Sequence, residues 1–233
     1  MKKDSVSIII PAFNEEKDIK ETISVVSRVA VSCISDFEII IVDDGSTDET
    51  GKIIEDIARQ NRRVKIVTHQ KNRGFGEAQR SGIKAATKKY ITGFPADSDQ
   101  TTKVLKDLIL QRKKADLVSS YMTNYFDRPL RRRFISRIYT AIINNVFGLN
   151  MRYYNGYYIC PSNLLKQLKL KSSGFSIFAE VKVKLLKRGC SCLEIPYLHK
   201  PRLHGVSKSL GLKSIFQTFY IFPILVRDIY FGE

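Results

Sequence analysis

Short β-branched runs alternate with segments of helical periodicity in the first part of the chain, and this alternation restricts the fold more than any other feature. Ile19, Ile23 and Val26 illustrate the helical spacing. The runs with the composition of buried strands are residues 6–10, 37–42, 64–67 and 90–94. Such alternation predicts βαβ units and a mostly parallel sheet flanked by helices. We therefore expect an α/β fold, with later strands at 116–120 and 192–197.

Acidic and amide residues follow three of these strands directly. They are Asn14-Glu15 after the first strand, Asp43-Asp44 after the second and Asp97-x-Asp99 after the fourth. In open parallel sheets, ligands bind beyond the carboxyl ends of the strands. The three groups are therefore expected to line one edge of the sheet and to form a binding site there.

Asp97 and Asp99 have the spacing of a divalent-metal site. Two carboxylates one residue apart at a strand end can both reach a hard cation such as Mg²⁺ or Mn²⁺. A cation held there would stabilise a departing diphosphate. An Asp-x-Asp taken alone is a weak signal that is better explained as a solvated turn, and the acidic ends of the other strands are what favour the metal interpretation.

The segment Gly74-Phe75-Gly76-Glu77-Ala78-Gln79 resembles part of a dinucleotide-binding fingerprint. Its third glycine is missing, and no acidic strand end follows at the expected distance. The first strand also leads into Pro11 and Ala12 in place of a glycine loop. A dehydrogenase is thus disfavoured. The glycines are expected to let Asn72 and Arg73 pass close to a ligand or a neighbouring strand.

The chain is strongly basic, with 39 Lys and Arg against 23 Asp and Glu and a net charge of +16. This balance favours an anionic partner: nucleic acid, a phosphorylated small molecule or an acidic membrane surface. Nucleic acid is disfavoured because no recognition motif accompanies the charge. The four cysteines lack metal or redox spacing and are expected to be small buried residues of a reducing compartment. Without a secretory signal in the sequence, we expect a cytoplasmic protein.

Two apolar segments suggest contact with a membrane surface. A cluster of arginines between Arg128 and Arg137 leads into the apolar residues 138–147, which are typical either of an interfacial helix or of a core helix with a solvated basic end. The tail, residues 211–233, contains an uncharged stretch from Ser214 to Val226 that Pro223 interrupts, and this stretch is too short to span a bilayer alone. Its helix would be buried against the domain, a second subunit in a homo-oligomer or the membrane surface.

Three further segments are candidates for the acceptor side of a site. Tyr153 to Tyr158 would be a strand and turn lining an acceptor, or an edge strand. Glu180 lies in a helix expected over 176–188, as a carboxylate base or as an exposed glutamate. The basic segment 202–208 would grip phosphate or form a solvated loop.

Taken together, these motifs resemble glycosyltransferase family 2, which has the GT-A fold, and within it the polyprenyl-phosphate (dolichyl-phosphate) hexosyltransferases. The resemblance covers roughly residues 5–210, which would be the transferase domain, and leaves 211–233 as the helical tail. The segments that carry it are 10–16, 42–48, 72–76, 97–99 and 202–208.

The resemblance implies roles for individual residues. The base and ribose of a nucleotide sugar, GDP- or UDP-hexose, would be held by Pro11, Ala12, Asn14, Glu15, Asp43, Asp44 and Arg73. Mg²⁺ or Mn²⁺ on the diphosphate would be held by Asp97 with Asp99. Phosphates of the lipid or the nucleotide would be bound by Arg128, Arg132, Ser136, Arg202, Ser207 and Lys208.

The sequence departs from the family pattern at two places. The family pattern at the metal site is Asp-Ala-Asp. If Ala96 is aligned with the family's alanine, Pro95 replaces the first acid and Asp97 is the second. If Asp97-x-Asp99 is aligned directly with the two acids, both are kept, so Asp99 is a ligand only in this second alignment. Near Tyr153 the acidic residue that often precedes a Ser/Thr-Gly is replaced by Tyr154-Asn155-Gly156. The implied function is an inverting, metal-dependent transfer of a hexose to a polyprenyl phosphate at the cytoplasmic face of the membrane.

Three alternatives remain. A saccharide hydroxyl acceptor would need a base, for which Glu180 is the candidate. A degenerate GT-A domain would bind nucleotide sugar without turnover, and Pro95 is its best support. A basic nucleic-acid binder is the weakest of the three.

Overall fold

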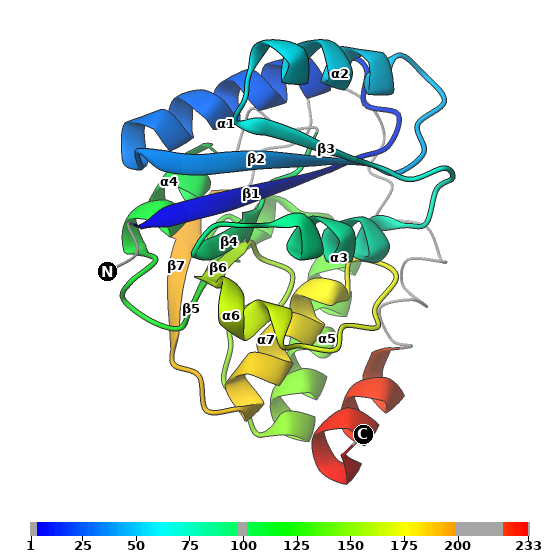
Figure 1. The fold of residues 1–233 in the computed structure, drawn as a ribbon. Coiled ribbons are helices and arrows are strands. Elements are labelled where there is room, and N and C mark those ends of the chain that lie inside the picture. The colour runs from blue at the N-terminus through cyan, green and yellow to red at the C-terminus, as the bar shows by residue number, and fades with distance from the viewer. Residues whose placement is uncertain (1–3, 97–101, 199–220, 233) are drawn as a thin grey trace.

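A computed structural model describes residues 4–96, 102–198 and 221–232. Its centre is a seven-stranded sheet with the order β3-β2-β1-β4-β6-β5-β7 (Figure 1). The strands are β1 (Ser5–Ala12), β2 (Asp36–Asp43), β3 (Val64–Thr68), β4 (Tyr90–Gly93), β5 (Leu117–Met122), β6 (Tyr158–Pro161) and β7 (Cys192–Tyr197). Each strand run anticipated from the sequence forms a strand within two residues of its expected bounds.

The sheet is parallel where the alternation predicts it. β1 pairs in parallel with β2 and β4, and β2 pairs in parallel with β3. β6 is antiparallel to both β4 and β5, whereas β5 and β7 are parallel. The expectation of an edge strand at Tyr153–Tyr158 was wrong: only Tyr158 belongs to a strand, and that strand lies inside the sheet.

Helices cover both faces of the sheet and give a three-layer α/β arrangement (Figure 1). α1 (Ile19–Cys33), α2 (Thr50–Gln60) and α4 (Thr102–Gln111) share one apolar core with the sheet. α3 (Phe75–Ala85), α6 (Ser162–Lys166) and α7 (Ile177–Lys187) share the core of the other face. The predicted α/β class and mostly parallel sheet are thus confirmed.

β1 shows how the sequence divides between these two cores. Ile8 and Ile10 belong to the core under α1, while Ile9 belongs to the core over α3. All three side chains are fully buried, and burying an isoleucine stabilises a fold by about 1.5–3 kcal/mol. A continuous apolar run therefore becomes a central strand with two buried faces, and its polar continuation emerges at the edge of the sheet.

A third apolar cluster joins α5 (Leu130–Phe147) to α7 and to the chain end. Tyr139, Ile143 and Phe147 of α5 are buried against Ile221 and Leu225, which lie in the helical segment 221–226 that continues into η3 (Arg227–Phe231). The second half of α5 is thus a core helix. The described part of the tail packs on the protein, and residues 211–220 lie outside the described residues. Within the described ranges, no helix has the length and apolar character needed to cross a bilayer.

The helix starts and the cysteines show local details that the sequence pattern does not specify. α1 begins at Ile19 and α2 at Thr50, and neither start has a side-chain cap, although Asn14 and Ser46 are polar residues shortly before these helices. The reason is that Asn14 and Ser46 are engaged between the two loops: the side chain of Ser46 accepts from the backbone N–H of Asn14, and the side chain of Asn14 accepts from the backbone N–H of Thr47. Of the four free cysteines only Cys160 is buried, which corrects the expectation that all are core residues.

Candidate functional site

The loops that follow β1 and β2 are joined by side chain–backbone hydrogen bonds. The backbone N–H of Asn14 donates to Ser46 Oγ (3.1 Å), and that of Thr47 donates to Asn14 Oδ1 (2.9 Å). The N–H of Glu15 donates to Thr50 Oγ1 (2.8 Å). Asn14 has a φ of 54°, a left-handed conformation that asparagine tolerates better than most residues. The two polar strand ends predicted from the sequence therefore form one continuous rim.

Asp43 and Asp44 end β2 as buried carboxylates, 5% and 3% exposed. Asp43 Oδ1 accepts from the N–H of Ser46 (3.0 Å). Asp44 accepts from the N–H groups of Arg73 (2.9 Å, Oδ1) and Gly74 (2.8 Å, Oδ2). Asp44 thus organises the segment before α3, in addition to the nucleotide contact that the resemblance implies.

His69, which follows β3, is a member of this rim that the sequence interpretation missed. Its Nδ1 lies 2.6 Å from Asp44 Oδ1, and its Nε2 lies 2.9 Å from Ser81 Oγ on α3. The residue is 7% exposed. The strand-end rule applied to β1, β2 and β4 applies to β3 as well and would have found it.

Gly74 and the first turns of α3 rest on the loop between α6 and α7. The N–H of Gly76 donates to Ser173 O (2.9 Å), and Arg80 Nη1 donates to Ser172 O (2.6 Å). A Cβ on Gly76 would lie 2.1 Å from Ser172 O, and Gly74 has a φ of 92°. These glycines therefore allow the backbone of residues 172–173 to approach, where we had expected a ligand or a neighbouring strand.

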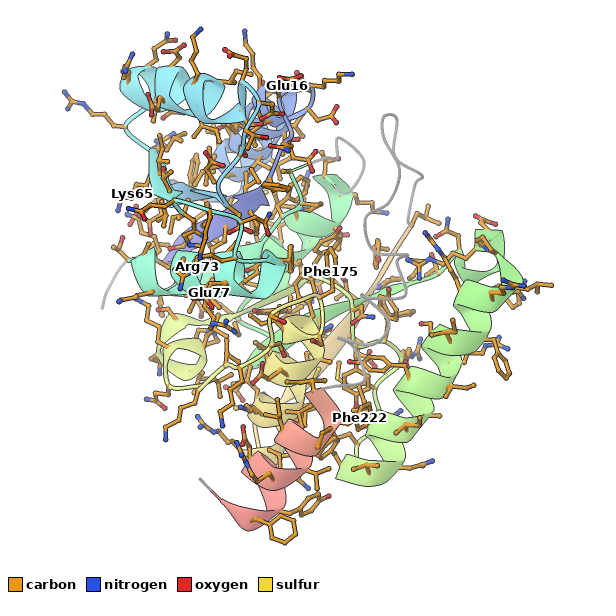
Figure 2. The ribbon with its side chains drawn as sticks, turned by 90° about the vertical axis from the view of Figure 1, so that its right-hand side faces the viewer. Glu16, Lys65, Arg73, Glu77, Phe175 and Phe222 are labelled. Carbon is orange, nitrogen blue, oxygen red and sulfur yellow. The ribbon has the colours of Figure 1, made fainter. Side chains whose placement is uncertain are left out.

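Arg73 is the charged residue of this segment. Its guanidinium lies 3.3 Å from the carboxylate of Glu77, one turn into α3, and Figure 2 shows the two side chains next to each other. Burial opposes the charge of Glu77, but the hydrogen bond from Arg80 and the positive charges of Arg80 and Arg73 together outweigh it, and the pKa of Glu77 is lowered. Arg73 is half-exposed, so it can contact a ligand at the rim.

The fourth strand brings the chain to the same edge. β4 pairs with β1, the N–H of Phe94 donates to Ile9 O (2.8 Å), and Thr22 Oγ1 donates to Ala96 O (2.7 Å). Pro11 and Ala12 lie at the end of β1 and pair with Val42 and Asp43. Asp97 and Asp99 lie outside the described residues, and the described ranges contain no cluster of three or more metal-ligating side chains.

Glu180 is fully buried, which corrects the expectation of an exposed glutamate on α7. Its carboxylate accepts from the backbone N–H groups of Lys171 (2.9 Å) and Ser172 (2.9 Å) and from Lys184 Nζ (2.9 Å). Lys184 also pairs with Asp228 at 2.8 Å. These donors occupy both carboxylate oxygens, and two of the donors are the backbone N–H groups of residues 171–172. The geometry therefore assigns Glu180 a structural role and does not support that of a base.

Arg128 and Arg132 lie together at the start of α5. The pKa of Arg132 is lowered mainly by burial, and the positive charge of Arg128 lowers it further. The Nε of Arg128 is buried and has no hydrogen-bond partner in the described part of the chain. Two neighbouring guanidinium groups with an unused donor are a ready binding site for an anion. Ser136, the third residue expected here, is half-buried one turn further along α5.

Two buried tyrosines interact electrostatically with this arginine pair, Tyr153 with Arg132 and Tyr197 with Arg128. The pKa of Tyr197 is raised mainly by burial and also by Tyr153 and Tyr157, whereas Arg128 opposes the increase. Below them, the fully buried Lys182 donates to the carbonyls of Gly156 (2.8 Å) and Tyr153 (3.4 Å). Burial lowers the pKa of Lys182 to about 7. The phosphate-binding candidates Arg202, Ser207 and Lys208 lie outside the described residues.

The model of the glycosyl transferase family 2 matches residues 7–169. This chain belongs to glycosyl transferase family 2. The match covers the rim described above and the arginine pair, and it confirms the resemblance drawn from the motifs.

The names of two relatives describe enzymes that act on polyprenyl phosphates. The dodecaprenyl-phosphate galacturonate synthase of Rhizobium johnstonii is 28% identical over 217 residues, which are 91% of this chain and 64% of that protein. The undecaprenyl-phosphate 4-deoxy-4-formamido-L-arabinose transferase of Edwardsiella ictaluri is 26% identical, over 92% of this chain and 66% of that protein. This family 2 chain thus spans about two thirds of the length of each relative.

Solved structures share the fold. Glucosyl-3-phosphoglycerate synthase from Mycobacterium tuberculosis, in complex with Mn²⁺, UDP-glucose and phosphoglyceric acid, superposes with a TM-score of 0.75. Its sequence identity is 20%, and the match covers 96% of this chain and 80% of that one. A second complex of the same synthase contains Mg²⁺ and UDP. The similarity confirms the predicted GT-A-like α/β architecture for this family 2 chain.

Proposed function

We propose that this family 2 chain transfers a hexose, with inversion, from a nucleotide sugar to a polyprenyl phosphate at the cytoplasmic face of the membrane. The observation that carries the proposal is the pair Arg128 and Arg132, whose mutual repulsion and unused Nε call for an anionic ligand. The names of the relatives supply the chemical class of that anion, a lipid phosphate.

The donor would occupy the rim at the carboxyl ends of β1, β2 and β4. Pro11, Ala12, Asn14 and Glu15 would contact the base and ribose together with Asp43. Asp44 would hold the backbone of Arg73 against the nucleotide, since both its oxygens accept from that segment. The complexes of the mycobacterial synthase favour UDP as the nucleotide.

Asp97, with Asp99, would hold Mg²⁺ or Mn²⁺ on the donor diphosphate. β4 and the bond from Thr22 to Ala96 direct the chain to the rim immediately before Asp97, and carboxylate oxygens suit either cation. When bound, the cation supplies positive charge for the diphosphate. Arg202 and Lys208 would add cationic hydrogen-bond donors to the same phosphates.

The acceptor phosphate would bind between Arg128 and Arg132. A phosphate oxygen forms the new bond to the anomeric carbon, and the carbon–oxygen bond to the nucleoside diphosphate breaks with its electron pair on the leaving group. Because the attacking oxygen is already anionic at neutral pH, no side chain has to remove a proton. The structural engagement of Glu180 agrees with this absence of a base.

The start of α5 also suits an anionic membrane surface. Phe126, Leu130 and Phe134 are 69%, 75% and 68% exposed, and arginines 131 and 137 beside them are exposed as well. Aromatic and aliphatic side chains interleaved with arginine partition into the headgroup region of anionic bilayers. Docking through this surface would bring the arginine pair to the level of a lipid phosphate.

The decisive experiment offers the purified protein polyprenyl phosphate and a panel of UDP- and GDP-hexoses with Mn²⁺. We expect a lipid-linked sugar, and Arg132→Gln should raise the KM for the lipid about tenfold or more by removing a charged phosphate contact. Arg131→Gln, on an exposed position of the same helix, is the matched control and should leave that KM unchanged. Turnover only with saccharide or soluble phosphorylated acceptors would exclude the lipid acceptor.

Membrane docking has a separate test by co-sedimentation with liposomes. Wild type should bind vesicles containing anionic lipid, and Phe134→Ser together with Leu130→Ser should weaken binding because two exposed apolar contacts are lost. A double variant that binds as well as wild type would exclude this surface.

A further inference from the structure

We propose that His69 is a positioning residue of the donor site. It orients the carboxylate of Asp44, and Asp44 in turn fixes the backbone of Arg73 and Gly74 against the nucleotide. The inference concerns how the segment before α3 is held, and it rests on the proposed function only in taking the bound molecule to be a nucleotide.

The geometry places His69 between two rigid elements. Its backbone N–H donates to Asp43 O (2.9 Å), which continues the pairing of β2 with β3. Its ring reaches Asp44 Oδ1 with Nδ1 at 2.6 Å and Ser81 Oγ with Nε2 at 2.9 Å. The ring therefore spans from the end of β2 to α3, and its orientation is set at both nitrogens.

The proton positions follow from the partners. A carboxylate only accepts, so Nδ1 carries a hydrogen and donates to Asp44. In the neutral ring Nε2 then accepts from the hydroxyl of Ser81. Glu77 faces the same histidine from α3 at longer range, where it pairs with Arg73 and Arg80.

Asp44 needs such a partner because its side chain is 5% exposed. A buried carboxylate is costly unless donors satisfy it. Oδ2 accepts from the N–H of Gly74, and Oδ1 is shared between the N–H of Arg73 and the ring of His69. Without the histidine, the carboxylate would keep its amide donors but lose the contact that sets its rotation.

The consequence concerns Arg73, the exposed cation of the segment. Its backbone position depends on the Asp44 carboxylate, and among the described residues its side chain pairs with Glu77. A small rotation of Asp44 would move the Arg73 and Gly74 amides together. Donor affinity should therefore depend on a residue that has no expected contact with the donor itself.

The test uses three substitutions that separate the two ring nitrogens. Asparagine places an amide N–H near the position of Nδ1, glutamine places one near Nε2, and leucine offers neither. We measure the affinity for UDP and for GDP with Mn²⁺ by calorimetry, and the KM for donor and for acceptor in the transfer assay. Ser7→Ala is the stability control, because it removes a buried 2.6 Å hydrogen bond to Glu38 near the start of β1, away from the rim.

We expect His69→Asn to bind nucleotide within about twofold of wild type, and His69→Leu and His69→Gln to bind about tenfold more weakly, the loss of one good hydrogen bond. The donor KM should rise in the same order while the acceptor KM stays constant. Ser7→Ala should lower thermal stability without changing nucleotide affinity. Equal affinity of the leucine variant and wild type would overturn the proposal, and so would weakening in proportion to lost stability alone. Nucleotide affinity measures the effect of the His69 substitutions even if no lipid-linked product forms. A wrong acceptor proposal can therefore be told apart from a wrong role for His69.

Discussion

The side chain of Asn14 bonds the end of β1 to the end of β2, because its Oδ1 accepts from the backbone N–H of Thr47 at 2.9 Å. Asn14 is also the one non-glycine residue with positive φ among the described residues. Both properties are local requirements on the same residue: an acceptor oxygen on a short side chain and tolerance of the left-handed conformation. The rim formed by the ends of β1 and β2 is therefore held by a residue that few others can replace.

Substitutions at Asn14 should separate these two requirements. Asn14→Gly removes the acceptor but suits the conformation, and should cost about 1 kcal/mol of unfolding free energy. Asn14→Ala removes the acceptor and adds backbone strain, and should cost about 1–2 kcal/mol more. Urea unfolding measures both. Equal stability of the alanine and glycine variants would show that the conformation of Asn14 imposes no strain.

Asp97 should be indispensable for metal-dependent transfer. Asp97→Ala should lower kcat/KM by about a hundredfold or more, since cation stabilisation of a leaving diphosphate contributes several kcal/mol. Removal of Mn²⁺ and Mg²⁺ with EDTA should reduce the wild type to a similar level. Asp56→Ala, at an exposed position on α2, is the control for loss of a carboxylate. Full metal-dependent activity in Asp97→Ala would exclude the metal assignment, and Asp99→Ala tests whether the second carboxylate is also a ligand.

Glu180→Gln distinguishes a structural carboxylate from a base. Removing its charge leaves the buried Lys184 with Asp228 as its remaining carboxylate, so the unfolding free energy should fall by about 3 kcal/mol. The kcat of the folded variant with polyprenyl phosphate should stay within a few-fold of wild type. Unfolding by urea and single-turnover kinetics below the unfolding temperature provide the two readouts. A large loss of kcat at unchanged stability would restore Glu180 as a base and favour a saccharide acceptor.

The protein should lose stability in acid because Glu38 becomes protonated there. Burial alone would raise its pKa, but Lys65 (2.6 Å), Ser7 (2.6 Å) and Thr87 donate to the carboxylate and the net pKa is lowered. The unfolded chain therefore takes up the proton first. The stabilisation by Glu38 is complete above its ordinary pKa and is lost as pH falls through the lower, folded pKa.

The variant that tests this is Glu38→Gln, measured by urea unfolding at a series of pH values. The unfolding free energy of wild type should decline below about pH 5, and the glutamine variant should decline less steeply over the same range. At neutral pH the variant should be less stable by about 1–3 kcal/mol, since its amide satisfies fewer donors. Parallel pH profiles for the two proteins would contradict the assignment.

The first half of the sheet could be predicted because its information is local. A β-branched run such as Ile8 to Ile10 prefers a strand, and the helical repeats between the runs force parallel pairing and a common edge for the polar ends. The family assignment follows from the same segments, and the comparisons confirm it.

The interior position of β6 and the near-complete burial of α7 could not be predicted in this way, although the helix itself was expected. The run Tyr158–Pro161 is short and contains a proline, and it becomes an interior strand because it fits antiparallel between β4 and β5. α7 has an apolar stripe typical of a half-exposed helix. It is packed instead between two apolar clusters, so that Glu180, Lys182 and Lys184 are buried too.

The sequence by itself determined the α/β class, the polar edge of the sheet where we propose the donor site, and the family, since strand period, helix period and strand-end polarity are properties of neighbouring residues. Only the tertiary structure decided which polar groups meet across that edge. Asp44 with His69 and Asn14 with Thr47 are brought together across 25 and 33 residues of sequence, and Glu180 meets the 171–172 backbone where the α6–α7 loop folds back on α7. A buried charge is stable only where such partners surround it, and no local pattern specifies those partners.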